Sequence, residues 1–276
     1  MTVSSVPSSR LRPLSMSAAE DIIQGLRKWD LWGRLGWLEI KRRYRRTIIG
    51  PFWTSLSLLI FVVVLGSVGS GLLSKEIAEY LPFLVAGMVV WVLLSTILIE
   101  SCSVLIGGAG LLRQKRFEYS TLAYALVWRN LIVFCHNMIV YFVIFGFYAP
   151  QLFSLKNFLA IPGLFLLLLN GIWLAILLGL VTLRFRDVQQ LVQSIVQISM
   201  FVTPIFWPPE TMSGVRRIIF VGLNPLYHLV SIVRDPLLGK DPRLNSYIAV
   251  LIVTLLGWTL TYVCFQKFRK RIPYWL

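Results

Sequence analysis

Glu100 is the one acidic residue that lies well inside a long apolar run, because residues 80–99 carry no charge. An ionisable side chain in such a run is a functional candidate if the run crosses a membrane. Its partner could be Arg129 or His136, at the start of another apolar run. No second carboxylate neighbours Glu100 in the sequence, which disfavours a proton relay. We therefore expect a structural ion pair.

Two stripes of polar side chains follow otherwise apolar segments, at spacings that place each stripe on one helix face. Amides and hydroxyls suit sugar hydroxyls, whereas an unpaired amide facing lipid costs several kcal/mol. The stripes must therefore meet another helix through hydrogen bonds or line a hydrated channel, and the sequence leaves both open. The first stripe is Gln190, Gln193 and Gln197 beside Ser194, and the second is Asn130, Asn137, Tyr141 and Tyr148.

The sequence offers no catalytic or metal-binding constellation. It contains no GxxxxGK[ST], HExxH or GxSxG pattern, so it predicts neither a nucleotide-binding P-loop nor these hydrolase sites. Cys102, Cys135 and Cys264 lie in apolar surroundings without CxxC spacing, which indicates core residues rather than metal ligands. We therefore expect no enzyme activity and no metal in this chain.

The composition indicates a membrane protein. Hydrophobic residues make up 57% of the chain and charged residues 14%, with a mean hydropathy of +0.74. A soluble domain usually carries about 25% charged residues. This balance excludes a disordered chain, a coiled coil and a disulfide-rich secreted scaffold.

Charge-free runs define six predicted transmembrane helices in an all-α fold, since a span needs about 20 mostly apolar residues. Together they form one domain, residues 47–276. The spans are predicted at about 48–73, 80–106, 127–148, 157–182, 188–207 and 246–267.

The basic residues predict the orientation. With both chain ends on the inner side, that side holds twenty Lys and Arg residues and the outer side holds seven. An excess of Lys and Arg marks the cytoplasmic side, so the prediction is N-in and C-in. The same asymmetry explains most of the net charge of +15 without a nucleic-acid partner.

The segments outside the spans predict three further features. Residues 1–16 are rich in Ser and Pro and predict a flexible start, and residues 17–46 predict an amphipathic interface helix that opens with a capping box and ends in basic residues. The inner loop 107–120 is either a docking segment for a cytoplasmic partner or an ordinary basic loop. The proline-rich outer segment 208–239 predicts short re-entrant helices that form a pathway or gate.

Four stretches carry a resemblance to a known family. They are LEIKRRYRRTIIGPFW at 38–53, RFRDVQQLVQSIVQISMFVTPIFWPPE at 184–210, NPLYHLVSIVRDPLLG at 224–239 and KFRKRIPYWL at 267–276. In this order and with six spans, they resemble the membrane subunit of type-2 ABC exporters. The branch is the one that exports O-antigen, capsule or teichoic-acid chains on lipid carriers.

The resemblance implies a homodimer of this chain with two separate ATP-binding cassette subunits in the bacterial inner membrane. Those subunits would bind ATP and Mg²⁺, and this chain would bind no cofactor. The implied function is export of a lipid-linked polysaccharide from the cytoplasmic to the outer face, with the interface-helix arginines attracting its pyrophosphate.

The residue patterns and the resemblance together assign candidate residues to four roles. Headgroup contact falls to Arg42, Arg43, Arg45 and Arg46, and coupling to the ATPase falls to Leu111, Leu112, Arg113, Gln114 and Phe117. The channel and gate candidates are Asn137, Tyr141, Gln190, Gln193, Gln197, Phe206, Trp207, Tyr227 and Arg234, and the family motif comprises Arg184, Arg186 and Asp187.

Three alternatives stay open at this point. The chain could export small amphiphiles or lipids within the same superfamily. It could be a membrane-embedded enzyme such as a lipid-phosphate transferase, although that would need clustered Asp, His or Arg residues at one membrane face. It could also be a non-transporting scaffold of glycan assembly.

Overall fold

The computed structural model describes residues 17–50, 52–114 and 117–276, and every regular element in these ranges is a helix. The predicted flexible segment 1–16 lies outside the described residues. The long helices are α3 (Phe52–Leu72), α4 (Ile77–Ser101), α7 (Ser120–Tyr148), α8 (Ala160–Arg184) and α12 (Leu244–Phe268). The shorter α-helices are α1 (Ala18–Arg27), α2 (Trp29–Tyr44), α5 (Val104–Gly107), α6 (Ala109–Gln114), α9 (Val188–Val202), α10 (Gly214–Arg217), α11 (Pro225–Leu237) and α13 (Ile272–Trp275). The remaining turns are η1 (Pro150–Leu152), η2 (Leu155–Leu159), η3 (Pro209–Thr211), the π-helical η4 (Ile218–Gly222) and η5 (Arg269–Arg271).

Among the described residues, five helices are long and apolar enough to cross a membrane, and they are the five long helices of the bundle. The remaining predicted span, residues 188–207, is the 15-residue helix α9. At about 1.5 Å per residue, α9 is about 22 Å long, which is shorter than the hydrocarbon core. The six-span arrangement therefore stays a prediction, with α9 as a shorter element beside five confirmed long helices.

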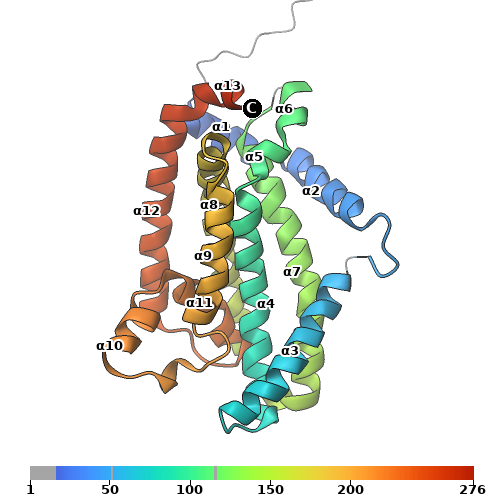
Figure 1. The fold of residues 1–276 in the computed structure, drawn as a ribbon, viewed down its shortest axis with the longest axis vertical. Helices are drawn as coiled ribbons and strands as arrows, with labels where there is room; N and C mark the ends of the chain where they lie inside the picture. Colours follow the sequence, from blue (N-terminus) through green and yellow to red (C-terminus); the bar gives the residue numbers. More distant parts are fainter. Residues whose placement is uncertain (1–16, 51, 115–116) are drawn as a thin grey trace, which may run out of the picture.

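Pro204 accounts for the early end of α9. The residue before a proline is pushed out of the helical region into extended backbone. Thr203 has φ −82° and ψ 136°, and its N–H makes the last helical hydrogen bond, to the carbonyl of Ser199. The chain then turns toward α10 instead of continuing through the bundle (Figure 1).

The helix α4 forms the centre of the bundle. Most of its apolar window is buried, whereas less than half of the window is buried in each of the other four long helices. It packs against α3, α7 and α8 over most of its length, and against α11. This asymmetry is expected of a membrane bundle, in which the outer helices turn their apolar faces to lipid.

The helix α11 lies inside the bundle rather than on its surface. Its residues from Tyr227 to Leu237 are all buried, and it packs against α4, α8 and α12. Pro236 has no N–H, so it leaves the carbonyl of Ile232 without its usual helix partner. A Cβ at Gly163 of α8 would lie 2.3 Å from that carbonyl oxygen, so glycine is what permits the close approach of the two helices.

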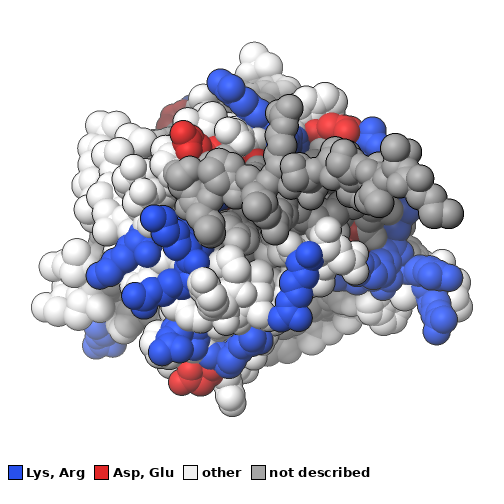
Figure 2. All heavy atoms as spheres, turned by 90° about the horizontal axis from the view of Figure 1, so that it is seen from above, with Lys and Arg blue, Asp and Glu red and all other residues white. Residues whose placement is uncertain are grey.

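The short helices gather at the two ends of the bundle. We call the end with α1, α2, α6 and α13 the α1 end, and the opposite end with α10 the α10 end (Figure 1). The view onto the α1 end shows many more Lys and Arg side chains than Asp and Glu side chains (Figure 2). The charge pattern of the sequence thus corresponds to one end of the folded bundle.

The predicted interface helix 17–46 is divided into two helices. The capping box predicted at its start is present, because Ser17 and Glu20 each accept a hydrogen bond from the other's backbone N–H. The helix breaks at Lys28, where φ is −85° and ψ is 48°, and α2 then runs to Tyr44. The break changes the direction of the chain, so that α1 and α2 each pack against α7 (Figure 1).

Candidate functional site

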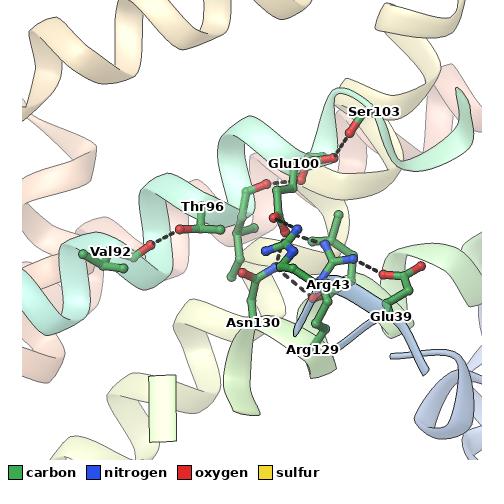
Figure 3. Close-up of polar contacts among 11 residues, drawn as sticks. Glu39, Arg43, Val92, Thr96, Glu100, Ser103, Arg129 and Asn130 are labelled. Atoms are coloured by element: carbon green, nitrogen blue, oxygen red, sulfur yellow. Dashed lines mark hydrogen bonds and ion pairs between the residues drawn. The ribbon is translucent and has the colours of Figure 1, made fainter. Parts of the chain in front are cut away.

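The first candidate site lies at the α1 end, where α2, α4 and α7 bring charged side chains together. Glu100 at the end of α4 meets Arg43 of α2 and Arg129 of α7, and Arg129 also reaches Glu39 of α2 (Figure 3). The expected Glu100–Arg129 ion pair is therefore present. The other proposed partner, His136, instead directs its Nδ1 to the carbonyl of Ile132, at 2.7 Å.

Glu100 is the centre of this inner cluster, which we define as Glu39, Arg43, Glu100, Arg129 and Asn130. Arg43 Nη2 donates to Glu100 Oε1 at 2.5 Å, while Asn130 Nδ2, at 3.0 Å, and Arg129 Nη2 donate to Oε2. The side chains of Glu100 and Arg129 are only 17% and 12% exposed. Removing one member of such a buried network leaves its partners with uncompensated charge.

The cluster fixes α2 to the bundle. Glu39 and Arg43 are four residues apart and so share one face of α2. Burial alone would lower the pKa of the Arg43 guanidinium, but its hydrogen bond to Glu100 and the charge of that carboxylate outweigh the burial and leave the pKa raised. Sequence analysis identified Glu100, Arg43 and Arg129 separately, but it missed Glu39 because nothing local marks it.

A cavity of about 790 Å³ opens beside the inner cluster, between α2, α7 and the segment from the end of α4 to α6. Arg42 and Arg43 both line it. Arg42 is exposed and forms no ion pair with any residue in the described ranges. A guanidinium without a protein partner on a cavity wall is suited to phosphate oxygens. Arg45 and Arg46, by contrast, lie exposed after the end of α2.

The predicted coupling segment, residues 107–120, contains α6. Leu111 and Leu112 are half-buried against the core and Phe117 is buried, so these apolar side chains attach the segment to the bundle. Arg113 and Gln114 are exposed. Arg113 donates to the carbonyl of Leu276, so the segment lies beside α13 at the α1 end.

Asp21 and Arg269 form a second buried ion pair at this end, which sequence analysis missed. Arg269 Nε and Nη2 donate to Asp21 Oδ2 at 3.0 and 2.8 Å, and the backbone N–H of Ser120 donates to Oδ1 at 3.0 Å. The pair ties α1 to the start of α7 and to the end of α12. Its partners are 248 positions apart, and Asp21 in isolation resembles an ordinary acidic residue in a first helical turn.

The second candidate site is the outer cluster at the α10 end, which we define as Pro204, Ser231, Arg234 and Asp235. Arg234 Nη1 donates to the carbonyl of Pro204 at 2.6 Å, and its Nε and Nη2 each donate to Asp235 Oδ1 at 3.2 Å. Ser231 Oγ donates to Asp235 Oδ2 at 2.6 Å.

Two aromatic rings complete the environment of Arg234. Its guanidinium carbon lies 5.1 Å from the ring centre of Phe83 and 5.7 Å from that of Tyr227, within cation–π range. Its side chain is only 2% exposed. One guanidinium thus joins the segment after α9 to α11 and to α4.

The two polar stripes have different environments. Asn137 and Tyr141 are buried within the chain, where Asn137 accepts from Ser55 Oγ at 3.1 Å and Tyr141 donates to the carbonyl of Leu237 at 2.7 Å. These two members of the stripe therefore make interhelical hydrogen bonds, whereas Tyr148 at its end is exposed. Gln190, Gln193 and Gln197 of α9, by contrast, are all exposed, alongside exposed Ile195 and Ile198.

The remaining candidate residues that the sequence suggested lie at the two ends of the bundle. Phe206 and Trp207 are half-buried, and Trp207 Nε1 donates to the carbonyl of Phe201 at 3.1 Å. Tyr227 is 1% exposed, so it is a packing partner of Arg234 rather than a surface aromatic. The motif residues are exposed at the end of α8, which is Arg184, and between α8 and α9, where Arg186 and Asp187 lie. The guanidinium carbon of Arg184 lies 5.8 Å from the ring centre of Trp275 in α13.

Comparison with known proteins gives a consistent result. Residues 31–238 match the family described as "ABC-2 type transporter". An O-antigen export system permease protein RfbA from Myxococcus xanthus is 25% identical over 195 residues, which cover 70% of this chain and 74% of the relative. Two proteins of the same name from Klebsiella pneumoniae are each 24% identical, over 238 and 240 residues, which cover 84% of this chain and 88% of each relative.

The matched range covers most of the chain and includes every residue of the inner and outer clusters, whereas Asp21 and Arg269 lie outside it. The chain therefore belongs to the ABC-2 type transporter family, as a membrane permease with several apolar helices. This confirms the family resemblance found in the sequence. Its matched relatives are permeases named for O-antigen export.

Proposed function

We propose that this chain is the channel-forming subunit of an ATP-driven exporter that moves a lipid-linked polysaccharide from the cytoplasmic to the outer face of the bacterial inner membrane. The family assignment supports a transporter, and the names of the relatives support an O-antigen-like substrate. On this proposal the α1 end faces the cytoplasm, in agreement with its basic surface, and the α10 end faces outward.

The exposed amide face of α9 is the observation that carries the proposal. Gln190, Gln193 and Gln197 are exposed on a helix otherwise rich in Ile, Leu and Val. Three amides facing lipid would each cost several kcal/mol. In the membrane this face therefore borders a hydrated path or a second copy of the chain, and a homodimer with the α9 helices along a central channel satisfies both. Sugar hydroxyls can then hydrogen-bond the amides along the path.

The α1 end supplies the cytoplasmic functions of this proposal. The cavity beside the inner cluster receives the pyrophosphate of the lipid carrier, with Arg42 as its first contact and Arg43, Arg45 and Arg46 as further cations. Two ATP-binding cassette subunits, which bind ATP and Mg²⁺, dock on the coupling segment through Arg113 and Gln114. Arg113 of α6 donates to the carbonyl of Leu276 after α13, and Asp21 of α1 accepts from Arg269 of η5 and from Ser120 of α7, so a displacement of the coupling segment reaches α1 and the start of α7.

The test is to co-express this chain with the ATP-binding subunit, purify the complex in detergent and measure its mass and ATPase activity. The proposal expects two copies of each subunit, with ATP hydrolysis stimulated by a lipid-linked polysaccharide. A second preparation carries Gln190→Leu, Gln193→Leu and Gln197→Leu, and it keeps the assembly but loses the stimulation. A chain that binds no ATP-binding subunit, or a complex stimulated only by small amphiphiles, would contradict the proposal.

A further inference from the structure

A cavity unrelated to either candidate site lies on the outside of the bundle. It has a volume of about 720 Å³ and is bounded by α7, η2 and α8. Its walls include Phe142, Phe153, Phe158 and Ile161, and its floor is formed by Val233 and Leu237 of the buried helix α11. We call it the lateral groove. In the lateral groove the outside of the bundle reaches α11, the helix that carries Arg234.

The polar side chains of the lateral groove are already committed to partners within the chain. Tyr141 donates to the carbonyl of Leu237 at 2.7 Å, and Asn157 Nδ2 donates to the same carbonyl at 2.9 Å and to that of Pro236 at 3.2 Å. Asn157 Oδ1 accepts from the N–H of Ser154 at 2.6 Å. These bonds satisfy the carbonyls at the end of α11 and leave an apolar wall. The groove is therefore suited to hydrocarbon rather than to a sugar or a nucleotide.

The lateral groove is continuous with the lipid-facing surface of two long apolar helices. Phe142 of α7 is 55% exposed, and Phe158 and Ile161, where η2 leads into α8, are 66% and 61% exposed. Both α7 and α8 are long and apolar enough to span the membrane. Exposed apolar side chains of membrane-spanning helices face the hydrocarbon of the bilayer, because that region excludes polar groups. A groove that opens on these faces is therefore surrounded by acyl chains. Because lipid surrounds the groove, we expect a lipid acyl chain to occupy it.

A cation flanks the lateral groove. Lys156 is not part of its lining, but in η2 it lies between Leu155 and Asn157, which both line the groove. Its side chain is 52% exposed and contacts Asp241, itself 70% exposed, at 2.8 Å. Exposed ion pairs contribute little, so Lys156 can exchange this partner for a lipid phosphate. The apolar wall and the flanking cation together match the chain and headgroup of one phospholipid.

We propose that the lateral groove binds one hydrocarbon chain of a membrane phospholipid, with its phosphate beside Lys156 and its chain against α11. This inference does not depend on which molecule the protein exports. It assigns α11 a lipid contact on the side opposite the outer cluster, so that the surrounding bilayer touches the helix directly.

The test uses the full chain in vesicles of phosphatidylethanolamine and phosphatidylglycerol that contain a small fraction of phosphatidylglycerol with a diazirine near the end of one acyl chain. After irradiation, peptide mass spectrometry locates the labelled residues. The proposal expects labelling concentrated at Phe142 and residues 153–161, above that of the exposed faces of α3 and α12. Ile161→Trp fills the groove and lowers this labelling several-fold, whereas Ile252→Trp on the exposed face of α12 leaves it unchanged.

A second variant tests the contact of Lys156 with the lipid phosphate. Lys156→Ala lowers labelling of the groove by about fivefold, the effect of one Lys near an anionic lipid. Lys75→Ala, a cation in another exposed pair at the same end, leaves it unchanged. Even labelling of all exposed helix faces would overturn the proposal, and so would labelling that survives Ile161→Trp. Loss of the label on addition of a lipid-linked glycan would overturn the proposal and show that the export substrate occupies the groove. Absence of label from residues 142–161 would also overturn it and would indicate that a second copy of the chain covers the groove.

Discussion

The inner and outer clusters hold arginines in opposite ways. At the α1 end, Arg43 and Arg129 share Glu100 beside a cavity of about 790 Å³, and Arg43 keeps nearly half of its side chain exposed. At the α10 end, Arg234 is enclosed by a carboxylate, a carbonyl and two rings and is only 2% exposed. The first arrangement leaves cations available to a ligand, and the second uses its cation as a structural tie. The environment, not the residue type, separates a binding arginine from a packing one.

The largest loss of stability is expected when Arg234 of the outer cluster is replaced. Arg234→Leu leaves Asp235, whose side chain is 9% exposed, without its cation, and such a loss costs about 3–5 kcal/mol. Thermal unfolding in detergent should show a large fall in midpoint. Arg216→Leu, an exposed arginine at the same end, is the control and should change stability by less than about 0.5 kcal/mol. Equal stability of the two variants would show that Arg234 is not a structural tie.

A smaller loss is expected at the inner cluster. Glu100→Gln removes the carboxylate from Arg43 and Arg129, but water reaches this partly exposed site, so the cost is about 2 kcal/mol. Glu39→Gln costs less, because Glu39 is 34% exposed and Arg129 keeps Glu100. Spin labels on α2 and α4, read by pulsed electron resonance, should show a broader distance distribution in Glu100→Gln than in Glu39→Gln. An unchanged distribution in both would mean that the cluster does not fix α2.

The contact between α8 and α11 gives a third test. Gly163→Ala would place a Cβ 2.3 Å from the carbonyl oxygen of Ile232, so the two backbones must separate, at a cost of about 1–2 kcal/mol. Gly146→Ala has no neighbour within 4 Å and should be neutral. Thermal unfolding compares the two alanine variants directly. A neutral Gly163→Ala would show that α11 can shift freely against α8.

The smallest effect on stability is expected at Arg42. Arg42→Ala removes an exposed cation without an ion-pair partner in the described ranges, so the unfolding midpoint stays nearly constant. The headgroup proposal nevertheless expects weaker stimulation of ATP hydrolysis by a lipid-linked polysaccharide, while the ATPase activity without substrate is preserved. Stimulation equal to that of the native complex would remove Arg42 from the headgroup site.

The sequence predicts what depends on local pattern and misses what depends on distant partners. Apolar runs located the five long helices, and Ser17 with Glu20 located the start of α1. The short length of α9 was not predicted. It results from the effect of Pro204 on the preceding residue, and the hydropathy of the run does not reveal this effect. Pairs such as Asp21 with Arg269 could not be predicted, because only the folded bundle brings residues 248 positions apart together.

The same limit applies to the polar stripes. Spacing placed Asn137 with Tyr141, and the three glutamines, on helix faces, but spacing does not say what a face meets. The structure buries the first pair against other helices of the same chain and leaves the glutamines exposed. Periodicity identifies a face, and only packing decides between an interhelical hydrogen bond and a surface that a further partner or water must cover.

The most direct test of the proposed function is ATP-dependent export in proteoliposomes that contain this chain, the ATP-binding subunit and a lipid-linked polysaccharide. A glycan-binding protein confined to the face opposite the ATP-binding subunits reports the polysaccharide that has crossed. The account predicts a signal that rises with ATP, needs both subunits and is lost when Gln190, Gln193 and Gln197 are replaced by Leu. A complex that hydrolyses ATP and moves small amphiphiles but never exposes the polysaccharide would contradict it.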